Sequence, residues 1–365
     1  MSRYFYFMYL VCMFVNTIFF TPRLLLLQRF EGGVMATILS VIIGSTYSIL
    51  FLWAISKFPG EGIPEIFQRE FPAFIRKPIL IFLGLMWPFA GSVILIAFTI
   101  ITLRFLNPET SLMMLLFCYC GICWWASTYR PQTILYVTEI IILFSLPVVL
   151  YIMYKAITSK WFNWSSLRIL ADYTFIWPSW TALAAATYSF TGYINMALYN
   201  RVFNPAHIRA KWLIPPLGVI LLFSSVIVPV GLLGVDNVDS YIYTWITSAD
   251  TLRMQFGVIE RVVFLFLFIY IGFSLTYITI TWNIGALMIS SCFRKQNITW
   301  KKFRLPIHAV ISMFYAVITF IAGLFTSDKS IFEWVTSWQI LRLISETLLV
   351  IIVVALALRK GRKHA

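Results

Sequence analysis

The stretch ATYSFTGYINMALYNRVFNP, residues 186–205, decides the fold because it places polar side chains inside a long apolar segment. Its polar side chains, and the one glycine among them, are Thr187, Ser189, Thr191, Gly192 and Asn195. At membrane depth the backbone leaves the helical path only where protein or a wet cavity satisfies it. We therefore expect a break here, in the kind of helix where many transporters hold a small substrate. The simpler alternative is an unbroken helix packed through small residues.

Composition places the chain in a membrane. Of 365 residues, 61% are hydrophobic and only 12% are charged, and the mean hydropathy is +0.87. A soluble protein of this size has too small an interior for that much apolar surface, so the bilayer is the expected solvent. The net charge of +14 would indicate nucleic acid in a soluble protein. Here it is attributed to cations kept on the cytoplasmic side, and no nucleic-acid partner is expected.

The five cysteines predict neither a disulfide framework nor a metal site. Cys118, Cys120 and Cys123 lie within LLFCYCGICWW, with no His or acid beside them. Their spacing permits a metal cluster, but buried inert thiols are the better interpretation. No metal or cofactor is expected.

Hydropathy predicts one membrane domain, residues 1–365, with ten spans of about 20 residues. The expected spans are Tyr4–Leu27, Val34–Ser56, Ile79–Leu103, Ser111–Thr128, Thr133–Tyr154, Trp177–Tyr199, Trp212–Leu233, Val258–Met288, Ile307–Phe325 and Trp338–Leu358. A surface helix is expected within Lys57–Pro78, and an apolar surface segment at Tyr241–Thr247 within the loop after the seventh span.

The distribution of cations predicts the orientation. If the N-terminus is cytoplasmic, most of the 28 Lys and Arg residues fall on the inside. These are Arg3, Lys57, Arg69, Arg76, Lys77, Arg130, Arg201, Arg209, Lys211, Arg294, Lys295, Lys301, Lys302, Arg304, Arg359, Lys360, Arg362 and Lys363. By the positive-inside rule, loops rich in Lys and Arg face the cytoplasm. Both termini are therefore expected inside, which requires an even number of spans.

Ten spans divide into two halves of five, and an odd number inverts the second half relative to the first. The first repeat would cover residues 4–154 and the second residues 177–358. Spans one and six, which have polar central residues, would then correspond. The agreement is one of pattern, because no sequence repeat joins the halves.

Several short motifs resemble those of spore germinant receptor B subunits. TPRLL at Thr21–Leu25 is similar to the end of their first span, and SFTGYINMALYNRVFNPAH at Ser189–His207 resembles their sixth span and following loop. The start of the eighth span at Ile259–Arg261 and FTSDKSIFEW at Phe325–Trp334, a loop before the last span, are also similar.

The resemblance implies the inverted-repeat fold of the amino acid, polyamine and organocation transporter superfamily, with broken helices one and six. It also implies a nutrient sensor, often for amino acids, in the inner membrane of a spore, beside A and C subunits. The chain departs from the pattern at Val15–Phe19, which has no glycine where the first helix would unwind. Unwinding costs more at β-branched residues than at glycine.

The candidate ligand site lies between spans one and six. Its predicted residues are Asn16, Thr17, Ser189, Thr191, Gly192 and Tyr193, with Tyr270 and Ser274 of the eighth span as further lining. The unpaired N–H and C=O groups at helix ends would bind the charged ends of an amino acid. An aromatic stripe that only packs is the alternative for the eighth span.

Two carboxylates lie inside predicted spans. Glu139 in the fifth span is a candidate proton or charge site, or else pairs with Arg130 or a neighbouring helix. Glu346 and Arg342, four residues apart, are predicted to neutralise each other.

Three functions remain open: a ligand-sensing subunit of a germinant receptor, a secondary amino acid permease, and a structural subunit with a vestigial pocket. An enzyme has no support, because the sequence contains no phosphate-binding loop, HExxH or serine triad.

Overall fold

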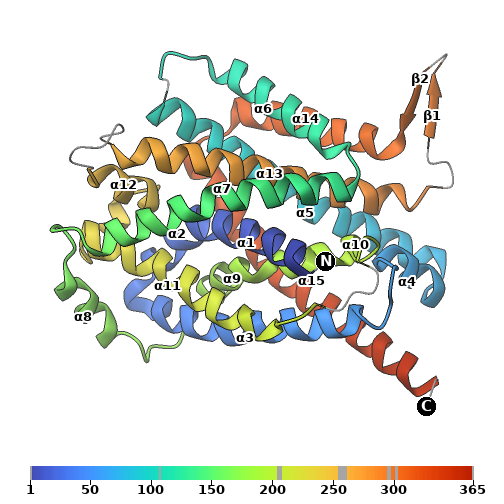
Figure 1. Ribbon diagram of the computed structural model, residues 1–365, viewed down its shortest axis with the longest axis horizontal. Coiled ribbons are helices and arrows are strands. Elements are labelled where there is room, and N and C mark those ends of the chain that lie inside the picture. Colours follow the sequence, from blue (N-terminus) through green and yellow to red (C-terminus); the bar gives the residue numbers. More distant parts are fainter. Residues whose placement is uncertain are drawn as a thin grey trace.

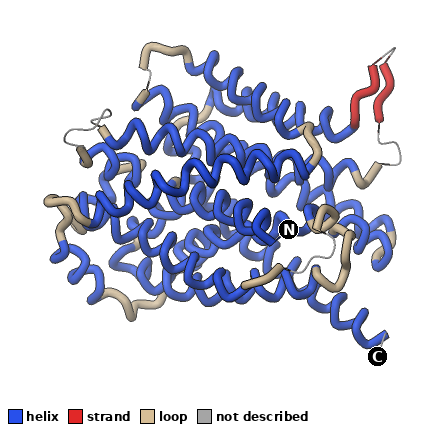
Figure 2. The backbone as a smooth tube through the Cα atoms, viewed as in Figure 1, coloured by secondary structure: helices blue, strands red, loops and turns tan. Residues whose placement is uncertain are grey.

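The computed structural model describes residues 2–106, 108–203, 208–253, 261–293, 297–300 and 303–363, almost all of them helical (Figures 1 and 2). The α-helices are α1 Ser2–Ile18, α2 Phe20–Leu27, α3 Val34–Ile55, α4 Ile63–Glu70, α5 Ala73–Phe105, α6 Leu112–Ser127, α7 Pro131–Ile157, α8 Trp164–Asp172, α9 Trp180–Thr187, α10 Met196–Tyr199, α11 Ile214–Leu233, α12 Thr244–Thr251, α13 Val262–Ser290, α14 Ile307–Phe325 and α15 Asp328–Lys363. Short non-α turns are η1 Arg29–Gly33, η2 Tyr188–Asn195, η3 Lys211–Leu213 and η4 Val238–Ser240.

Within the described ranges, seven helices are long and apolar enough to cross a membrane, or eight if α1 and α2 form one span. The seven are Arg29–Ile55, Ala73–Phe105, Pro131–Ile157, Lys211–Leu233, Val262–Ser290, Ile307–Phe325 and Lys329–Gly361. The fourth expected span is α6, which has 16 residues against the ~20 of a typical span, and the sixth is α9, η2 and α10 together. An integral membrane protein is therefore supported, while ten spans in an inverted repeat stay a prediction.

The first expected span bends by 43° between α1 and α2. The change of direction falls at Phe19, whose φ of −98° and ψ of −83° lie outside the helical region. A negative φ is open to any residue with a side chain. This explains how the chain bends here without the glycine that unwinding usually uses.

The sixth expected span is interrupted by η2, a 3₁₀ helix of eight residues. Runs of 3₁₀ helix this long are uncommon, and inside a longer helix they often mark a hinge or strain. Every residue of η2 is buried, and η2 packs along α1. The two interrupted segments therefore lie side by side in the interior.

Both termini lie at one end of the bundle (Figure 1). Ser2 accepts a 3.2 Å hydrogen bond from the backbone of Arg209, and Lys360 donates one of 2.8 Å to the carbonyl of Lys57. Helix α4 lies at the same end, while α8 and α12 lie at the other. An even number of spans would place both termini on one side, in agreement with this arrangement. Which end faces the cytoplasm stays a prediction.

The most extensive contact between two helices joins α5 and α13. A side chain at Gly285 would place its Cβ 2.2 Å from Pro88 Cγ and 2.6 Å from the carbonyl oxygen of Gly84. Small residues allow such close backbone approach, which replaces the hydrophobic effect as the source of helix association in a bilayer.

Two short helices outside the long spans were expected on the surface. Helix α4, Ile63–Glu70, lies within Lys57–Pro78 as expected, although α5 already begins at Ala73 and contains Pro78. Helix α12 does not lie on the surface, since Trp245 and Ile246 are buried against α11 and α13.

The last helix is longer at both ends than expected. It begins at Asp328, so the predicted loop Phe325–Trp334 is mostly helical, and it continues through the basic tail to Lys363. An antiparallel hairpin that the all-α expectation did not include, β1 Asn297–Trp300 with β2 Phe303–Pro306, precedes α14. Residues 254–260, 294–296 and 301–302, which include the start of the expected eighth span and most cations of its following loop, lie outside the described residues.

Candidate ligand site at the helix breaks

The change from α to 3₁₀ geometry frees carbonyl groups at the end of α9. The backbone N–H of Tyr188 bonds to the carbonyls of Ala185 and Ala186, so the carbonyl of Ala184 loses its helical donor. Carbonyl groups at a helix end need partners from elsewhere, and in a bilayer interior those partners come from protein.

Side chains from three other helices supply those partners. Arg342 of α15 donates a 2.6 Å hydrogen bond from Nη2 to the Ala184 carbonyl oxygen. Thr21 of α2 donates one of 3.0 Å to the carbonyl of Ala185, and Asn16 of α1 donates one of 2.9 Å to that of Tyr188. The break is thus held by α1, α2 and α15 together.

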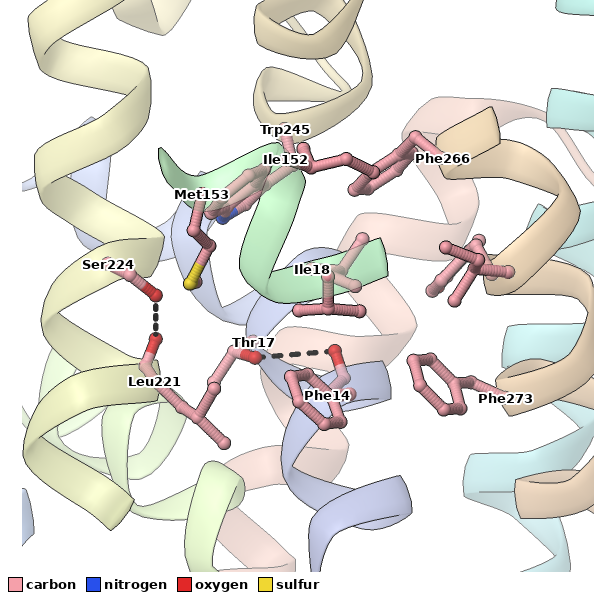
Figure 3. Close-up of a pocket in the computed structure, with 13 residues that line it drawn as sticks. Phe14, Thr17, Ile18, Ile152, Met153, Leu221, Ser224, Trp245, Phe266 and Phe273 are labelled. Atoms are coloured by element: carbon pink, nitrogen blue, oxygen red, sulfur yellow. Dashed lines mark hydrogen bonds between the residues drawn. The ribbon is translucent and has the colours of Figure 1, made fainter. Parts of the chain in front are cut away.

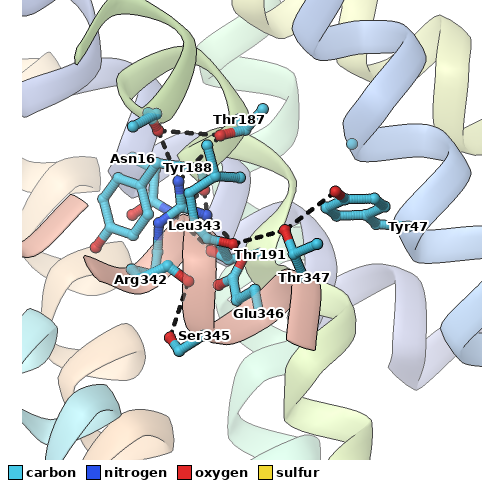
Figure 4. A network of polar contacts seen from close by, with 12 residues as sticks. Asn16, Tyr47, Thr187, Tyr188, Thr191, Arg342, Leu343, Ser345, Glu346 and Thr347 are labelled. Atoms are coloured by element: carbon cyan, nitrogen blue, oxygen red, sulfur yellow. Dashed lines mark hydrogen bonds and ion pairs between the residues drawn. The ribbon is translucent and has the colours of Figure 1, made fainter. Parts of the chain in front are cut away.

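Arg342 is at the centre of a buried polar network (Figure 4). Its Nη1 lies 2.7 Å from Oε2 of Glu346, and the two side chains are only 4% and 5% exposed. Its Nη2 also donates a 3.0 Å hydrogen bond to Thr187, and its guanidinium lies 5.4 Å from the ring centre of Tyr188. The predicted pairing of Arg342 with Glu346 agrees with this geometry.

A small polar cavity of about 20 Å³ adjoins this network. It is lined by Met86, Trp87 and Ala90 of α5, by Tyr188, Thr191 and Tyr277, and by Trp338, Arg342, Ser345 and Glu346 of α15. A cavity of this size holds a water molecule and no organic ligand. An amino acid does not fit in this cavity at its present size.

A second cavity, of about 30 Å³, lies beside the bend between α1 and α2 (Figure 3). Its lining is almost entirely apolar and includes Phe14, Ile18, Phe266 and Phe273. Thr17 lines it but donates its hydroxyl to the carbonyl of Met13 in its own helix, at 2.7 Å. The lining residues of this cavity provide apolar contacts, and none of them is charged.

The residues predicted for the ligand site are distributed over several places. Thr191 lines the polar cavity and accepts a 3.3 Å hydrogen bond from Asn16. Thr17 and Tyr270 line the apolar cavity. Tyr193 packs its ring 5.4 Å from that of Phe51.

Ser189 and Ser274 are fully buried and line neither cavity. Gly192 is a packing residue in this structure. A Cβ there would lie 2.9 Å from Tyr9 Cδ2 and 3.0 Å from Tyr9 Cα, so the glycine lets η2 approach α1. Its φ is not positive, because Gly32, Gly60 and Gly234 account for the positive-φ glycines of the described residues.

Glu139 pairs with a neighbouring helix, α1, which was one of its two expected pairings, and not with Arg130. Its Oε1 lies 3.2 Å from Nε of Arg3, near the end of the bundle that carries the termini, and Arg3 is 62% exposed. Glu139 itself is 18% exposed and has a cation as its partner, so it is not an isolated buried charge.

Sequence reasoning missed the part of α15 that faces η2. It identified the pair of Arg342 and Glu346 but not its link to the break, nor the aromatic residues Trp87, Tyr188 and Trp338 around it. The available signal was a full charge inside an apolar span, which by default indicates function.

A helical bundle with apolar spans, two interrupted segments in contact and a buried polar network defines an integral membrane protein. The chain belongs to the spore permease family of spore germination proteins, whose family model matches residues 2–321. The resemblance found in the motifs is thus confirmed. No curated protein matches the chain.

Proposed function

We propose that this protein is a nutrient-sensing subunit of a spore germinant receptor in the spore inner membrane. It binds a small germinant, an amino acid, between the first and sixth spans and signals to A and C subunits. The observation that carries the proposal is a break in each of these spans in a chain of the spore germination family, with side chains of other helices holding the break in the sixth.

The contacts at the break suggest how binding is converted into a signal. Asn16, Thr21 and Arg342 hold carbonyls of one short segment from three different helices. A ligand that competes for these donors changes the preferred positions of α1 and α15 relative to η2. The conformational equilibrium shifts by no more than the ligand's differential affinity for the two states.

Spores test the proposal directly. Spores that lack this chain should regain a germination response to amino acids when the wild-type chain is returned, and only when the A and C subunits are also present. Asn16→Ala with Thr191→Ala should weaken the response, while Glu139→Gln should not. A full response in the absence of the partner subunits would contradict the proposal.

A secondary amino acid permease of the same fold is the alternative, and it is favoured by the permease-like family alone. Vesicles that contain only this protein separate the two functions. Accumulation of labelled amino acid against its gradient would establish transport, whereas a sensor needs binding without accumulation.

A further inference from the structure

We infer that the ligand's two charged groups bind at Arg342 and Glu346 on α15, in the polar cavity between η2, α5 and α13. The ligand class is a small zwitterionic amino acid, with its carboxylate on Arg342 and its ammonium group on Glu346. The inference rests on the proposed function and adds to it a place and a chemistry. Helix α15 lies beyond the residues that the family model matches.

The first argument is an unused donor. Arg342 bonds through Nη1 to Glu346 and through Nη2 to Ala184 and Thr187, while its Nε has no partner among the described residues. The side chain is 4% exposed, so that donor is buried. A planar guanidinium presents paired donors that match a carboxylate.

The second argument is the lining of the cavity. Trp87, Tyr188, Tyr277 and Trp338 bring four aromatic side chains to the cavity that Glu346 also lines. Aromatic faces attract an ammonium group, and more strongly where water is excluded. The apolar cavity near the α1 bend has no charged residue in its lining, so it offers no counterpart for either end of a zwitterion.

The third argument is selectivity. Separating a buried ion pair is strongly unfavourable unless each charge gains a new partner. A zwitterion inserted between Arg342 and Glu346 supplies both partners at once. An amino acid amide leaves Arg342 uncompensated, and an N-acetyl amino acid leaves Glu346 uncompensated. The pair therefore rejects molecules that carry only one of the two charges.

The fourth argument connects binding to movement. The cavity of about 20 Å³ is too small for an amino acid, so binding requires α15 to move away from η2 and α5. Arg342 also holds the Ala184 carbonyl at the break. When the guanidinium turns toward a ligand carboxylate, that carbonyl loses a donor, and the geometry of the sixth span changes with it.

Binding to the purified full-length protein in lipid nanodiscs tests the inference. The probes are the twenty standard L-amino acids, followed by the amide and the N-acetyl form of whichever binds. The inference predicts that each derivative binds at least about tenfold more weakly, because each loses one charge-assisted hydrogen bond in a buried site. If either derivative bound as tightly as the unmodified amino acid, the inference would be overturned. This measurement uses the wild-type protein, so it does not depend on the folding of a variant.

Variants locate the site. Glu346→Gln should weaken binding, and the doubly neutral Arg342→Gln/Glu346→Gln should weaken it further. Glu139→Gln, which changes a matched carboxylate outside the cavity, should bind as the wild type does. Unchanged binding in the doubly neutral variant, with loss in Asn16→Ala, would overturn the inference and leave the proposed function intact. If none of the twenty amino acids binds the wild type, both fail.

Discussion

Arg342 and Ala184 are joined by a 2.6 Å hydrogen bond from a guanidinium to a backbone carbonyl that the change to 3₁₀ geometry has released. One residue of the last helix therefore supplies a hydrogen-bond donor to the backbone of the interrupted sixth span. Glu346 balances its charge at 2.7 Å. The break in the helix and the buried ion pair depend on each other.

Removal of either member of this pair should destabilise the fold. Arg342→Met leaves the Glu346 carboxylate buried and uncompensated, and should lower the free energy of unfolding by about 3–5 kcal/mol. The double variant Arg342→Met/Glu346→Leu should cost less than either single change, because no lone charge remains. Denaturant unfolding in detergent measures the free energy of unfolding of the two single variants and the double variant. Arg3→Gln, which removes an exposed ion pair, is the control and should change that free energy by about zero. Additive losses in the double variant would show that the two residues act independently.

Gly192 should tolerate no side chain without loss of stability. Gly192→Ala places a Cβ about 3 Å from Tyr9, and overpacking of this kind typically costs about 1–3 kcal/mol. Gly121→Ala is the matched control, because nothing lies within 4 Å of its Cβ position. The larger Gly192→Leu should abolish the germinant response while the protein still reaches the membrane. A normal response from that variant would show that the contact between η2 and α1 is not needed for signalling.

The loop at the far end of the bundle should show an acid-sensitive contact. Asp239 lies 3.2 Å from Arg29, and although burial raises the pKa of Asp239, its hydrogen bond to Arg29 and the charges of Arg29 and Arg23 lower it below its ordinary value. The stabilisation is therefore present above the ordinary pKa of about 3.9 and is lost as the pH falls through the lower folded value.

Comparison of the wild type with Asp239→Asn measures that contact. The variant should melt at a lower temperature at pH 5 to 7, by an amount equivalent to about 1 kcal/mol or less since Asp239 is 40% exposed. The two melting curves should converge below about pH 4. A difference that grows on acidification would mean that Asp239 is not held as an anion by Arg29.

Orientation can be tested with exposed positions at the two ends. In a background without the five native cysteines, Asn237→Cys should react with an impermeant maleimide on intact cells, because its loop is expected outside. Lys57→Cys, at the end that carries the termini, should react only after permeabilisation. The reverse pattern would place both termini outside.

The sequence was sufficient for the class of fold and for the places where it is interrupted. Polar residues in an apolar segment predict a departure from the helix, because hydrocarbon does not satisfy freed backbone groups, and η2 occupies that segment. The bend in the first span also falls where the sequence indicates a departure from the helix. It occurs at Phe19, the last residue of the stretch Val15–Phe19.

The composition of the site was less predictable, because it depends on which faces of distant helices meet. The sequence predicts Asn16 and Thr191 as site residues from their positions at the breaks, and Asn16 donates a 3.3 Å hydrogen bond to Thr191. The approach of Arg342 to Ala184 joins residues 158 apart in the chain, and no local pattern encodes it. The sequence predicts Gly192 as part of the ligand site, whereas in the structure a Cβ at that position would meet Tyr9.

The last prediction concerns ion coupling. A pump driven by an ion gradient needs a site for that ion, and Glu139 was the strongest sequence candidate. Its carboxylate lies 3.2 Å from Arg3 near one end of the bundle, and the second buried candidate, Glu346, is held by Arg342. We therefore expect binding without coupled accumulation: vesicles that contain this protein alone should show no uptake driven by a proton or sodium gradient, and Glu139→Gln spores should germinate normally. Arg342→Gln spores are the matched comparison and should lose the response. Robust gradient-driven uptake that disappears in Glu139→Gln would instead establish a transporter that uses Glu139 as its coupling site.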